Sequence, residues 1–241
     1  MGNNREIVVT GGGTGIGYAV AAAFAQAGER VTITGRREKV LTEAAALAGA
    51  RPVVFDAADP AAVEAALDEL PDRVDVLVNN AGGNTDFLDG DESGLAGFAA
   101  AFERNLKSNV VSAALVTHAL RDRLADGARI ITIGSIAAHT GAGSYGAAKA
   151  AVEGWNVSVA REFGPRGITA NVVAPGLIGE TEFFHGQLSD SRREWLIGNT
   201  MNKRPGTPED VVAVVTFLAS PAAGHVTGQV VHVNGGAHLG K

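Results

Sequence analysis

A tyrosine and a lysine lie one helical turn apart in a segment made mostly of small residues. The segment reads GSYGAAKAAVEGW over residues 143–155, with Tyr145 and Lys149 as its reactive side chains. Residues four positions apart share one face of an α-helix, so the phenol and the ammonium group are expected to be neighbours. A nearby cation lowers the pKa of a phenol from its usual value of about 10. The pair predicts a proton-transfer site with room for a ligand; the alternative is a small-residue helix that happens to carry two polar groups.

A glycine-rich turn follows the first strand-like run of the chain. It reads Thr-Gly-Gly-Gly-Thr-Gly-Ile-Gly over residues 10–17 and precedes an alanine-rich helical segment. Glycines allow a backbone to approach a pyrophosphate closely, and a helix N-terminus offers free N–H groups and a positive potential. A plain strand-to-helix turn is the alternative, but the place of this loop favours a dinucleotide site. The residues predicted to bind the cofactor here are Gly11, Thr14, Gly15, Ile16 and Gly17.

Two arginines end the second strand-like run, at the place where dinucleotide-binding proteins select their cofactor. NAD-binding proteins have a carboxylate there, which accepts a hydrogen bond from the ribose 2′-hydroxyl. This chain has Arg36 and Arg37 instead, and a guanidinium can bind the 2′-phosphate of NADP(H). Two solvated arginines at a helix start are the alternative. The sequence therefore favours NADP(H) over NAD(H), with Arg36 as the main phosphate ligand and Arg37 as support.

Short apolar runs alternate with helix-length segments along the chain, and most runs are nearly continuous in branched apolar residues, as buried parallel strands are. Strands are expected at residues 6–9, 30–34, 52–55, 74–79, 129–133, 169–174 and 229–233. Helices are expected at residues 16–27, 38–48, 60–70, 95–124, 144–163 and 208–219. The alternation predicts one α/β domain over residues 1–241, a Rossmann-type doubly wound parallel sheet of about seven strands with helices on both faces.

One irregular segment, residues 176–201, interrupts the alternation and is predicted to form a lid over the substrate. It holds Phe183, Phe184 and Trp195, and it ends at Met201. Large apolar side chains in such a segment favour an apolar or aromatic roof over the pocket.

Composition narrows the possible partners. The net charge is −6 with basic residues in ones and twos, so no nucleic-acid partner is expected. No apolar run approaches the ~18 residues of a membrane span, so no membrane partner is expected either. The chain has no cysteine, and its six histidines show no metal-ligand spacing. The sequence therefore predicts no metal site, and a cytoplasmic location is the expectation.

Five motifs together resemble those of the short-chain dehydrogenase/reductase family, in its small single-domain branch. The loop at 10–17 matches T-G-x-x-x-G-x-G, residues 79–82 match N-N-A-G, and residues 145–149 match Y-x-x-x-K. Pro175-Gly176 follows the sixth expected strand, and residues 233–236 resemble V-D-G-G with asparagine in place of aspartate. The resemblance covers nearly the whole chain, and its general look is closest to 3-oxoacyl-[acyl-carrier-protein] reductase-like members.

The resemblance implies further cofactor contacts. Asp56, followed by Ala57, would contact the adenine, although a plain turn residue is the alternative for Asp56. Ile178 and Thr181 would contact the nicotinamide carboxamide, but Thr181 follows the proline by six positions where the family usually has five. The other residues that the resemblance places at the cofactor are Asn80, Ala81, Gly82, Tyr145, Lys149, Pro175 and Gly176.

The resemblance also implies a catalytic tetrad. Tyr145 would transfer the proton, Lys149 would tune it and hold the nicotinamide ribose, and Ser135 would orient the substrate oxygen. Asn105 would hold a water chain that reaches the lysine, and neighbouring Asn109 is expected to be structural. A strand-end turn is the alternative for Ser135.

The ten positions from Ser135 to Tyr145 are fewer than is usual in the family. The short loop predicts a more open pocket or a lid that descends further. Within the loop, Ser144 is expected to cap the helix that carries Tyr145, and His139 has no assigned role.

The implied function is an NADP(H)-dependent oxidoreductase that interconverts a carbonyl and a secondary alcohol. Its partners would be a small-molecule carbonyl or alcohol substrate and further copies of the same chain, as a dimer or tetramer. A dinucleotide-binding sensor or scaffold without catalysis is the alternative, and loss of the tyrosine or the lysine would have favoured it.

Overall fold

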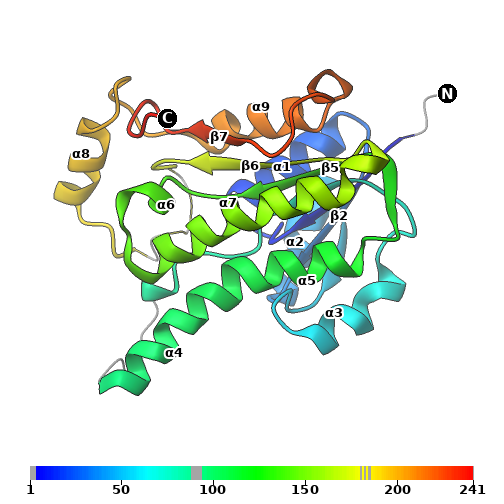
Figure 1. Cartoon of the computed structure of the whole chain (residues 1–241), viewed down its shortest axis with the longest axis horizontal. Coiled ribbons are helices and arrows are strands. Elements are labelled where there is room, and N and C mark those ends of the chain that lie inside the picture. The colour runs from blue at the N-terminus through cyan, green and yellow to red at the C-terminus, as the bar shows by residue number, and fades with distance from the viewer. Residues whose placement is uncertain (1–3, 88–93, 180, 182, 184–185, 241) are drawn as a thin grey trace.

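Seven parallel strands form one central sheet with helices on both faces (Figure 1). The structure is a computed structural model and describes residues 4–87, 94–179, 181, 183 and 186–240. The strands are β1 (Glu6–Thr10), β2 (Arg30–Gly35), β3 (Arg51–Val54), β4 (Val74–Asn79), β5 (Leu124–Ile133), β6 (Thr169–Pro175) and β7 (Val230–Val233), in the order β3-β2-β1-β4-β5-β6-β7. The order reverses between β1 and β4, and ligands of open α/β sheets bind at the carboxyl ends of the strands beside such a point. The predicted fold is confirmed.

The helices of the described residues divide between the two faces of the sheet. They are α1 (Gly15–Gln26), α2 (Glu38–Ala48), α3 (Pro60–Ala66), α4 (Gly94–Leu106), α5 (Ser112–Ala119), α6 (Ala137–Thr140), α7 (Gly143–Phe163), α8 (Asp190–Gly198) and α9 (Pro208–Leu218). One core packs α1, α2 and α9 on the sheet through Phe24, Leu41 and Val215. The other core packs α3, α5 and α7 through residues such as Val116 and Val159. None of the helices in this part of the chain is long and apolar enough to cross a membrane.

The predicted long helix at 95–124 is wrong in its continuity and its end. A π-helical turn at Lys107–Val111 separates α4 from α5, and α5 ends at Ala119. Leu124 already pairs with Val74, so β5 begins five residues before the predicted Arg129, with a shift of register between Val74 and Val76. The polar and glycine residues at 126–127 hid this early strand start, because they break the apolar run in the sequence.

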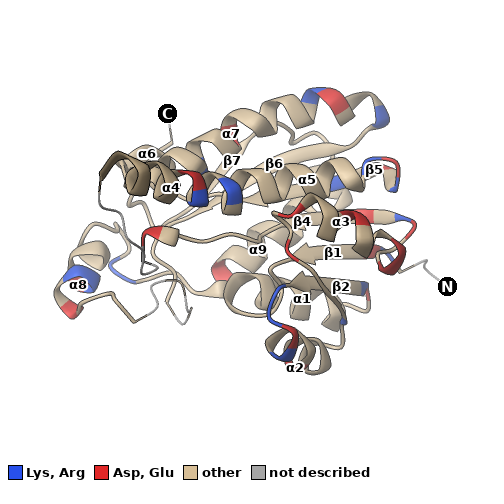
Figure 2. Cartoon of the chain, turned by 90° about the horizontal axis from the view of Figure 1, so that it is seen from below, with Lys and Arg blue, Asp and Glu red and all other residues tan. Residues whose placement is uncertain are grey.

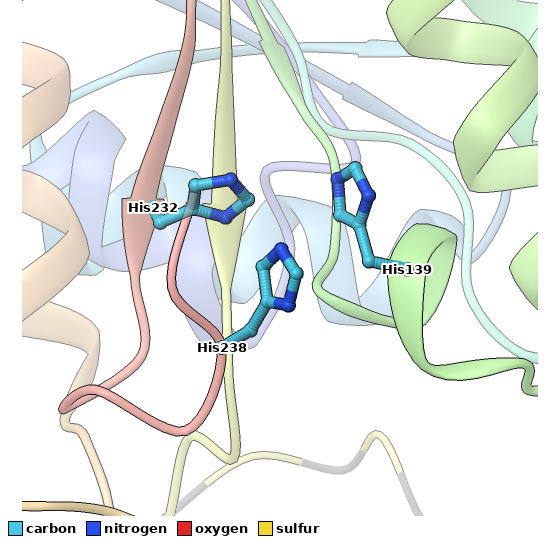
Figure 3. Close-up of side chains that lie close together, drawn as sticks. All are labelled: His139, His232 and His238. Carbon is cyan, nitrogen blue, oxygen red and sulfur yellow. The ribbon is translucent and has the colours of Figure 1, made fainter. Parts of the chain in front are cut away.

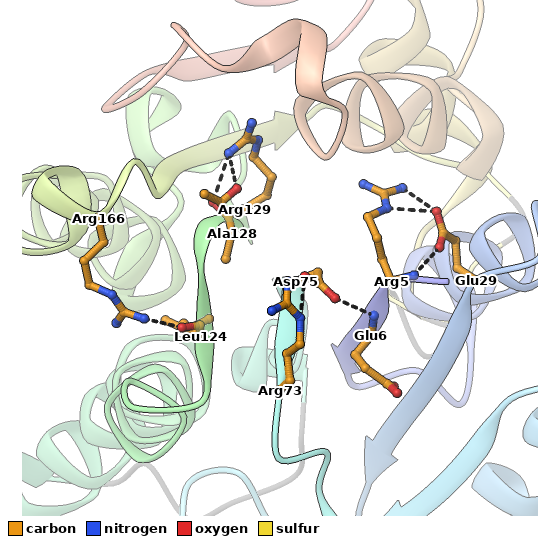
Figure 4. Close-up of polar contacts among 10 residues, drawn as sticks. Arg5, Glu6, Glu29, Arg73, Asp75, Leu124, Ala128, Arg129 and Arg166 are labelled. Carbon is orange, nitrogen blue, oxygen red and sulfur yellow. Dashed lines mark hydrogen bonds and ion pairs between the residues drawn. The ribbon is translucent and has the colours of Figure 1, made fainter. Parts of the chain in front are cut away.

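Arginines brace the edge of the sheet where the strands begin (Figure 4). Arg5 pairs with Glu29 at 2.7 Å, and Arg73 pairs with Asp75 at 2.7 Å. The other carboxylate oxygen of Asp75 accepts from the Glu6 N–H at 2.9 Å and so ties β1 to β4. Basic and acidic residues are interleaved along the ribbon in Figure 2. The bracing contacts lie at the edge opposite the glycine-rich loop, which follows the carboxyl end of β1.

Candidate active site

The glycine-rich loop packs directly against the loop that follows β4. Gly11 has φ +65°, and a Cβ there would lie 2.9 Å from Ala81 Cα. A Cβ on Gly17 would overlap the Gly11 carbonyl oxygen and Asn80 Nδ2. Asn80 Nδ2 donates to the carbonyl oxygens of Thr10 at 3.1 Å and Gly11 at 3.0 Å. Glycine is therefore required here for backbone packing, which holds the two loops side by side.

The start of α1 offers the anion-binding geometry that the sequence predicts. Thr14 precedes the helix with extended backbone, and the first helical residues are Gly15 and Ile16. First-turn N–H groups have no partner within a helix, and they lie at its positive end. Thr181 lies beside this turn, since a Cβ on Gly15 would be 3.6 Å from Thr181 Cγ2. The donor set and the small residues fit the pyrophosphate of a dinucleotide, and the predicted contact of Thr181 with the nicotinamide carboxamide stays a prediction.

Arg36 and Asp56 face one another beyond the ends of β2 and β3. Arg36 Nη1 lies 3.9 Å from Asp56 Oδ2, and the Arg36 side chain is 75 % exposed. The other Asp56 oxygen accepts from the Ala58 N–H at 2.9 Å, so the carboxylate is fixed by its own turn, and Ala57 is buried. Arg37 is the cap residue of α2. An exposed ion pair of this length contributes little to stability, so Arg36 keeps its capacity to bind an added anion.

The segment after β6 continues the wall of the site. Pro175 accepts at its carbonyl from the Ile136 N–H at 3.0 Å, which joins the ends of β5 and β6. Gly176 packs on Asn234, where a Cβ would lie 2.8 Å from Asn234 Cβ. Ile178 is buried and bridges to Gly206. Together these contacts set the start of the predicted lid.

Tyr145, Lys149 and Ser135 come together in the interior. Tyr145 and Lys149 are 6 % and 5 % exposed, and Lys149 Nζ is 5.8 Å from the Tyr145 ring centroid. The Ser135 side chain lies beside the Tyr145 phenol and favours its ionised form, and Ser135 Oγ accepts from the Ala137 N–H at 3.1 Å. Lys149 Nζ donates to the Ile133 carbonyl oxygen at 2.8 Å. Both reactive side chains of the GSYGAAKAAVEGW segment therefore point at the end of β5, where Ser135 stands.

The net pKa shift of Tyr145 in this structure is upward, whereas the sequence predicts a lowered pKa. Burial raises the pKa of Tyr145 to about 12, and the Ser135 side chain, which lowers the pKa, offsets this only in part. Burial also lowers the pKa of Lys149 to about 8. At neutral pH the phenol is therefore a proton donor, which suits delivery of a proton to an oxygen.

The buried lysine predicts a characteristic dependence of stability on pH. The pKa of Lys149 falls from 10.5 to about 8 on folding, so between these values the unfolded chain binds the proton that the folded chain has released. Stability must rise with pH in this window.

The free energy of unfolding of the wild type relative to Lys149→Met should rise by up to about 1.4 kcal/mol per pH unit. Urea unfolding of the cofactor-free proteins at pH values of about 7, 8.5 and 9.5 measures this difference. An exposed-site control, Lys39→Met, should show no such trend, and parallel wild-type and Lys149→Met curves would contradict the assignment.

The contacts of Asn105 with the described residues lead away from Lys149. It is fully buried, its Oδ1 accepts from the Thr85 N–H at 3.0 Å, and its Nδ2 donates to Asp86 Oδ1 at 2.6 Å and to Ser144 Oγ at 2.8 Å. In the described part of the chain these contacts lead to the start of α7, not to Lys149. Ser144 likewise bonds Asp86 at 2.8 Å and does not cap α7, whose cap residue is Ala142.

Asn109, expected to be structural, lies at the cofactor side of the site. It sits within the π-helical turn, and its side chain binds both backbone groups of Gly83, at 3.0 Å to the N–H and 2.8 Å to the carbonyl. Gly82 has φ +146°, and a Cβ there would lie 2.6 Å from Asn109 Oδ1. Asn109 therefore fixes the loop at 79–83. In the sequence, Asn109 stood out only because it follows Asn105 by four residues. The π-helical turn changes which way a side chain at that spacing faces, so the spacing did not predict this role.

Among the described residues of the predicted lid, Phe183 makes an aromatic contact with the site. The ring of Phe183 lies 5.6 Å, centroid to centroid, from that of Tyr145. Trp195, on α8, is 54 % exposed and is covered by the Arg192 guanidinium at 4.2 Å, while Met201 is 66 % exposed. Phe184 lies outside the described residues. The aromatic roof therefore rests on Phe183, and Trp195 faces outward.

Three histidines that are distant in sequence meet at the edge of the site. His139, His232 and His238 place ligand nitrogens within 4.8 Å of one another. The sequence did not predict this cluster, because its three members are not close in sequence: they come from α6, β7 and the segment after β7.

Comparisons with known proteins agree with the geometry. A family model described as enoyl-(acyl carrier protein) reductase matches residues 11–238. The chain is 37 % identical over 245 residues to the 3-oxoacyl-[acyl-carrier-protein] reductase of Escherichia coli K12, covering 96 % of each protein. It is 35 % identical to the corresponding enzyme of Mycobacterium bovis, covering 98 % of this chain and 94 % of that protein.

Solved structures show the same likeness. A blue fluorescent protein from a metagenomic library, in complex with NADPH, superposes with a TM-score of 0.86 at 32 % identity, covering 98 % and 99 % of the two chains. A short chain dehydrogenase from Burkholderia cenocepacia in complex with NADP gives 0.82 at 32 % identity, covering 98 % of each. The chain belongs to the short-chain dehydrogenase/reductase family and is an NAD(P)-dependent oxidoreductase.

Proposed function

We propose that the protein is an NADP(H)-dependent reductase that converts a carbonyl group to a secondary alcohol. The observation that carries the proposal is the grouping of Ser135, Tyr145 and Lys149 at the end of β5. The Ser135 side chain interacts with the Tyr145 phenol, and Lys149 Nζ lies 5.8 Å from the Tyr145 ring centroid. Two neighbouring hydroxyls can both contact a single substrate oxygen, one as an acid and one as an orienting donor. The test is NADPH oxidation against a panel of carbonyl compounds. Tight NADPH binding without turnover across the panel would favour a sensor.

The residues divide the chemistry as follows. When bound, NADPH supplies the hydride that adds to the carbonyl carbon. Ser135 holds the carbonyl oxygen by a hydrogen bond, and Tyr145 donates its proton to that oxygen as negative charge develops there. Lys149, charged at neutral pH, stabilises the phenolate that remains and has donors for the ribose hydroxyls. Phe183 covers the Tyr145 ring and shields the proton transfer from water.

The pairing of Ser135 and Tyr145 favours a carbonyl group, and not a carbon–carbon double bond, as the group that is reduced. A carbonyl reduction places the new charge on one oxygen, where paired hydroxyl donors stabilise it directly. The family model takes its description from an enoyl reductase, whereas the two relatives above are 3-oxoacyl reductases. A 3-oxoacyl thioester is therefore the first substrate to test.

The choice of NADP(H) rests on Arg36, which is exposed and, among the described residues, has its carboxylate contact at 3.9 Å, with Asp56. Its guanidinium stands beside Asp56, where the adenosine end of a dinucleotide would lie if the pyrophosphate occupies the start of α1. Solved relatives in complex with NADPH and NADP support the choice.

The water relay to Lys149 belongs to Asn109 rather than to Asn105 in this proposal. A π-helical turn displaces backbone hydrogen bonds, and the freed carbonyls can bind water. Asn109→Ala should lower kcat at saturating NADPH by roughly tenfold or more. Asn105→Ala should keep kcat within a few-fold of the wild type. Both variants should lower the free energy of unfolding by about 1–3 kcal/mol, because both side chains are buried and hydrogen-bonded. Steady-state kinetics of both variants at saturating NADPH separate the roles, and a loss of kcat confined to Asn105→Ala would return the relay to Asn105.

A homo-oligomer is part of the proposal. The outer face of α5 and α7 carries an apolar groove of about 390 Å³ whose lining includes Val111, Leu115, Trp155 and Val159. A second copy of the chain would cover these side chains, and light scattering of the purified protein gives the number of copies. A cytoplasmic location remains a prediction.

A further inference from the structure

The three-histidine cluster joins two segments at the carboxyl edge of the sheet (Figure 3). His139 lies on α6, four residues after Ser135, His232 lies on β7, and His238 follows in the C-terminal segment. The ring centroids are 4.6 Å apart for His139 and His238, 4.9 Å for His232 and His238, and 5.4 Å for His139 and His232. Every pair is therefore in contact.

One nitrogen of the cluster is buried without a partner. His232 Nδ1 has almost no exposed surface and makes no hydrogen bond among the described residues. A buried polar atom without a partner is costly, and such atoms commonly mark a missing water or ion. Each ring nitrogen of a neutral imidazole carries either a proton or a lone pair, and a lone pair can bind a cation. A metal ion bound at Nδ1 would supply the partner that this atom lacks among the described residues.

A carboxylate fixes the orientation of one imidazole. His139 Nε2 lies 3.1 Å from Glu153 Oε1, and Glu153 is 14 % exposed. An ionised carboxylate only accepts hydrogen bonds, so Nε2 carries the proton and Nδ1 of the neutral ring keeps its lone pair. This carboxylate–histidine arrangement is the one that supports metal-bound imidazoles in proteins.

The cluster is accessible, and a rotation of one ring with a closer approach of the nitrogens would complete a coordination site. His232 borders a cavity of about 220 Å³ whose lining also includes Asn202, Asn234 and Gly235, so a hydrated ion can reach it. Zinc–nitrogen bonds of about 2.0–2.1 Å at tetrahedral angles require nitrogens about 3.3 Å apart, closer than the present 4.8 Å limit. The rings of His139 and His238 stack at 4°, and one must turn because a metal binds in the plane of each imidazole.

We propose that His139, His232 and His238 bind one late first-row divalent cation of the Zn²⁺ type, with water in the remaining position. Three neutral imidazoles suit zinc, nickel or copper, whereas Mg²⁺ and Ca²⁺ require oxygen ligands. The bound ion ties α6, and with it the loop after Ser135, to the C-terminal segment. The metal site is independent of the proposed reductase activity, because it uses none of the residues assigned to the reaction.

The first test is the metal content of protein purified without a histidine tag. After treatment with a chelator, the wild type is dialysed against low Zn²⁺, and the zinc bound per chain is measured by mass spectrometry. The wild type should bind one equivalent, and His232→Ala and His238→Ala should each lose it. His225→Ala is the matched control, because His225 is exposed and outside the cluster, and it should bind as the wild type does.

Two further measurements do not depend on those variants folding. X-ray absorption of the zinc-loaded wild type should show about three imidazole nitrogens at about 2.0–2.1 Å. Glu153→Gln keeps the three ligands and should weaken zinc affinity by about 10–100-fold. A wild type that binds no more zinc than His238→Ala, or a zinc spectrum without imidazole scattering, overturns the proposal. NADPH binding, assayed separately, reports on the cofactor site and is unaffected by that result.

Discussion

Tyr145→Phe is expected to lower kcat by about 10²–10⁴-fold while NADPH affinity stays nearly unchanged. The change removes one hydroxyl and keeps the ring, so the contact with Phe183 is preserved. Without the phenol, the buried site has no acid within reach of the substrate oxygen, because Ser135 is a much weaker proton donor. Initial rates of NADPH oxidation, together with fluorescence titration of NADPH, separate the chemical step from binding.

The chain offers a matched control for this experiment. Tyr18, the other tyrosine, lies on α1 and packs against the apolar core. Tyr18→Phe removes the same hydroxyl from a site with no assigned chemistry and should keep wild-type kcat. Equal activity of the wild type and Tyr145→Phe would remove Tyr145 from the mechanism.

Arg36→Ala is expected to weaken NADPH binding by about 10–100-fold and to leave NADH binding almost unchanged. A charge-assisted hydrogen bond contributes about 1.5–3 kcal/mol, and each 1.4 kcal/mol is a factor of ten. The Arg36 side chain is exposed, so screening favours the lower part of this range, and the difference should shrink as salt rises. Dissociation constants for both cofactors at low and high salt measure the effect.

Lys39→Ala supplies the control for charge alone. Lys39 is exposed in the first turn of α2, three residues after Arg36. The Lys39→Ala substitution removes the same unit of charge as Arg36→Ala, but from a residue with no proposed phosphate contact. An equal loss of NADPH and NADH affinity in Arg36→Ala would refute the phosphate role. An equal effect of Lys39→Ala on NADPH would reduce that role to general electrostatics.

Local patterns in the sequence predicted the parts of the site that depend on backbone conformation. The glycines of residues 11–17 were identifiable because loop packing allows no side chain at Gly11 or Gly17. The parallel sheet followed from continuous apolar runs, since a strand buried on both faces leaves no polar alternation. Helical spacing placed Tyr145 and Lys149 on one helix face, and their catalytic roles were predicted from the family motifs.

Features set by long-range packing could not be read from the same patterns. The π-helical turn at Lys107–Val111 places the side chain of Asn109 against the backbone of Gly83. The extra residue in this turn cannot be recognised from the pattern of residue types in the sequence. The pKa of Tyr145 is raised because its side chain is buried, and the effect of burial is larger than the opposing effect of Ser135. The histidine cluster depends on the return of the C-terminal segment to α6.

The most direct test of the central claim follows the hydride itself. NADPH carrying deuterium at the transferred position is incubated with the wild type and a 3-oxoacyl thioester, and the product is analysed by NMR and mass spectrometry. The account predicts one deuterium on the carbinol carbon of a 3-hydroxyacyl product and almost no product with Tyr145→Phe. Consumption of NADPH without deuterium at that carbon would contradict it, as would deuterium incorporated only when a 2-enoyl thioester replaces the 3-oxoacyl substrate.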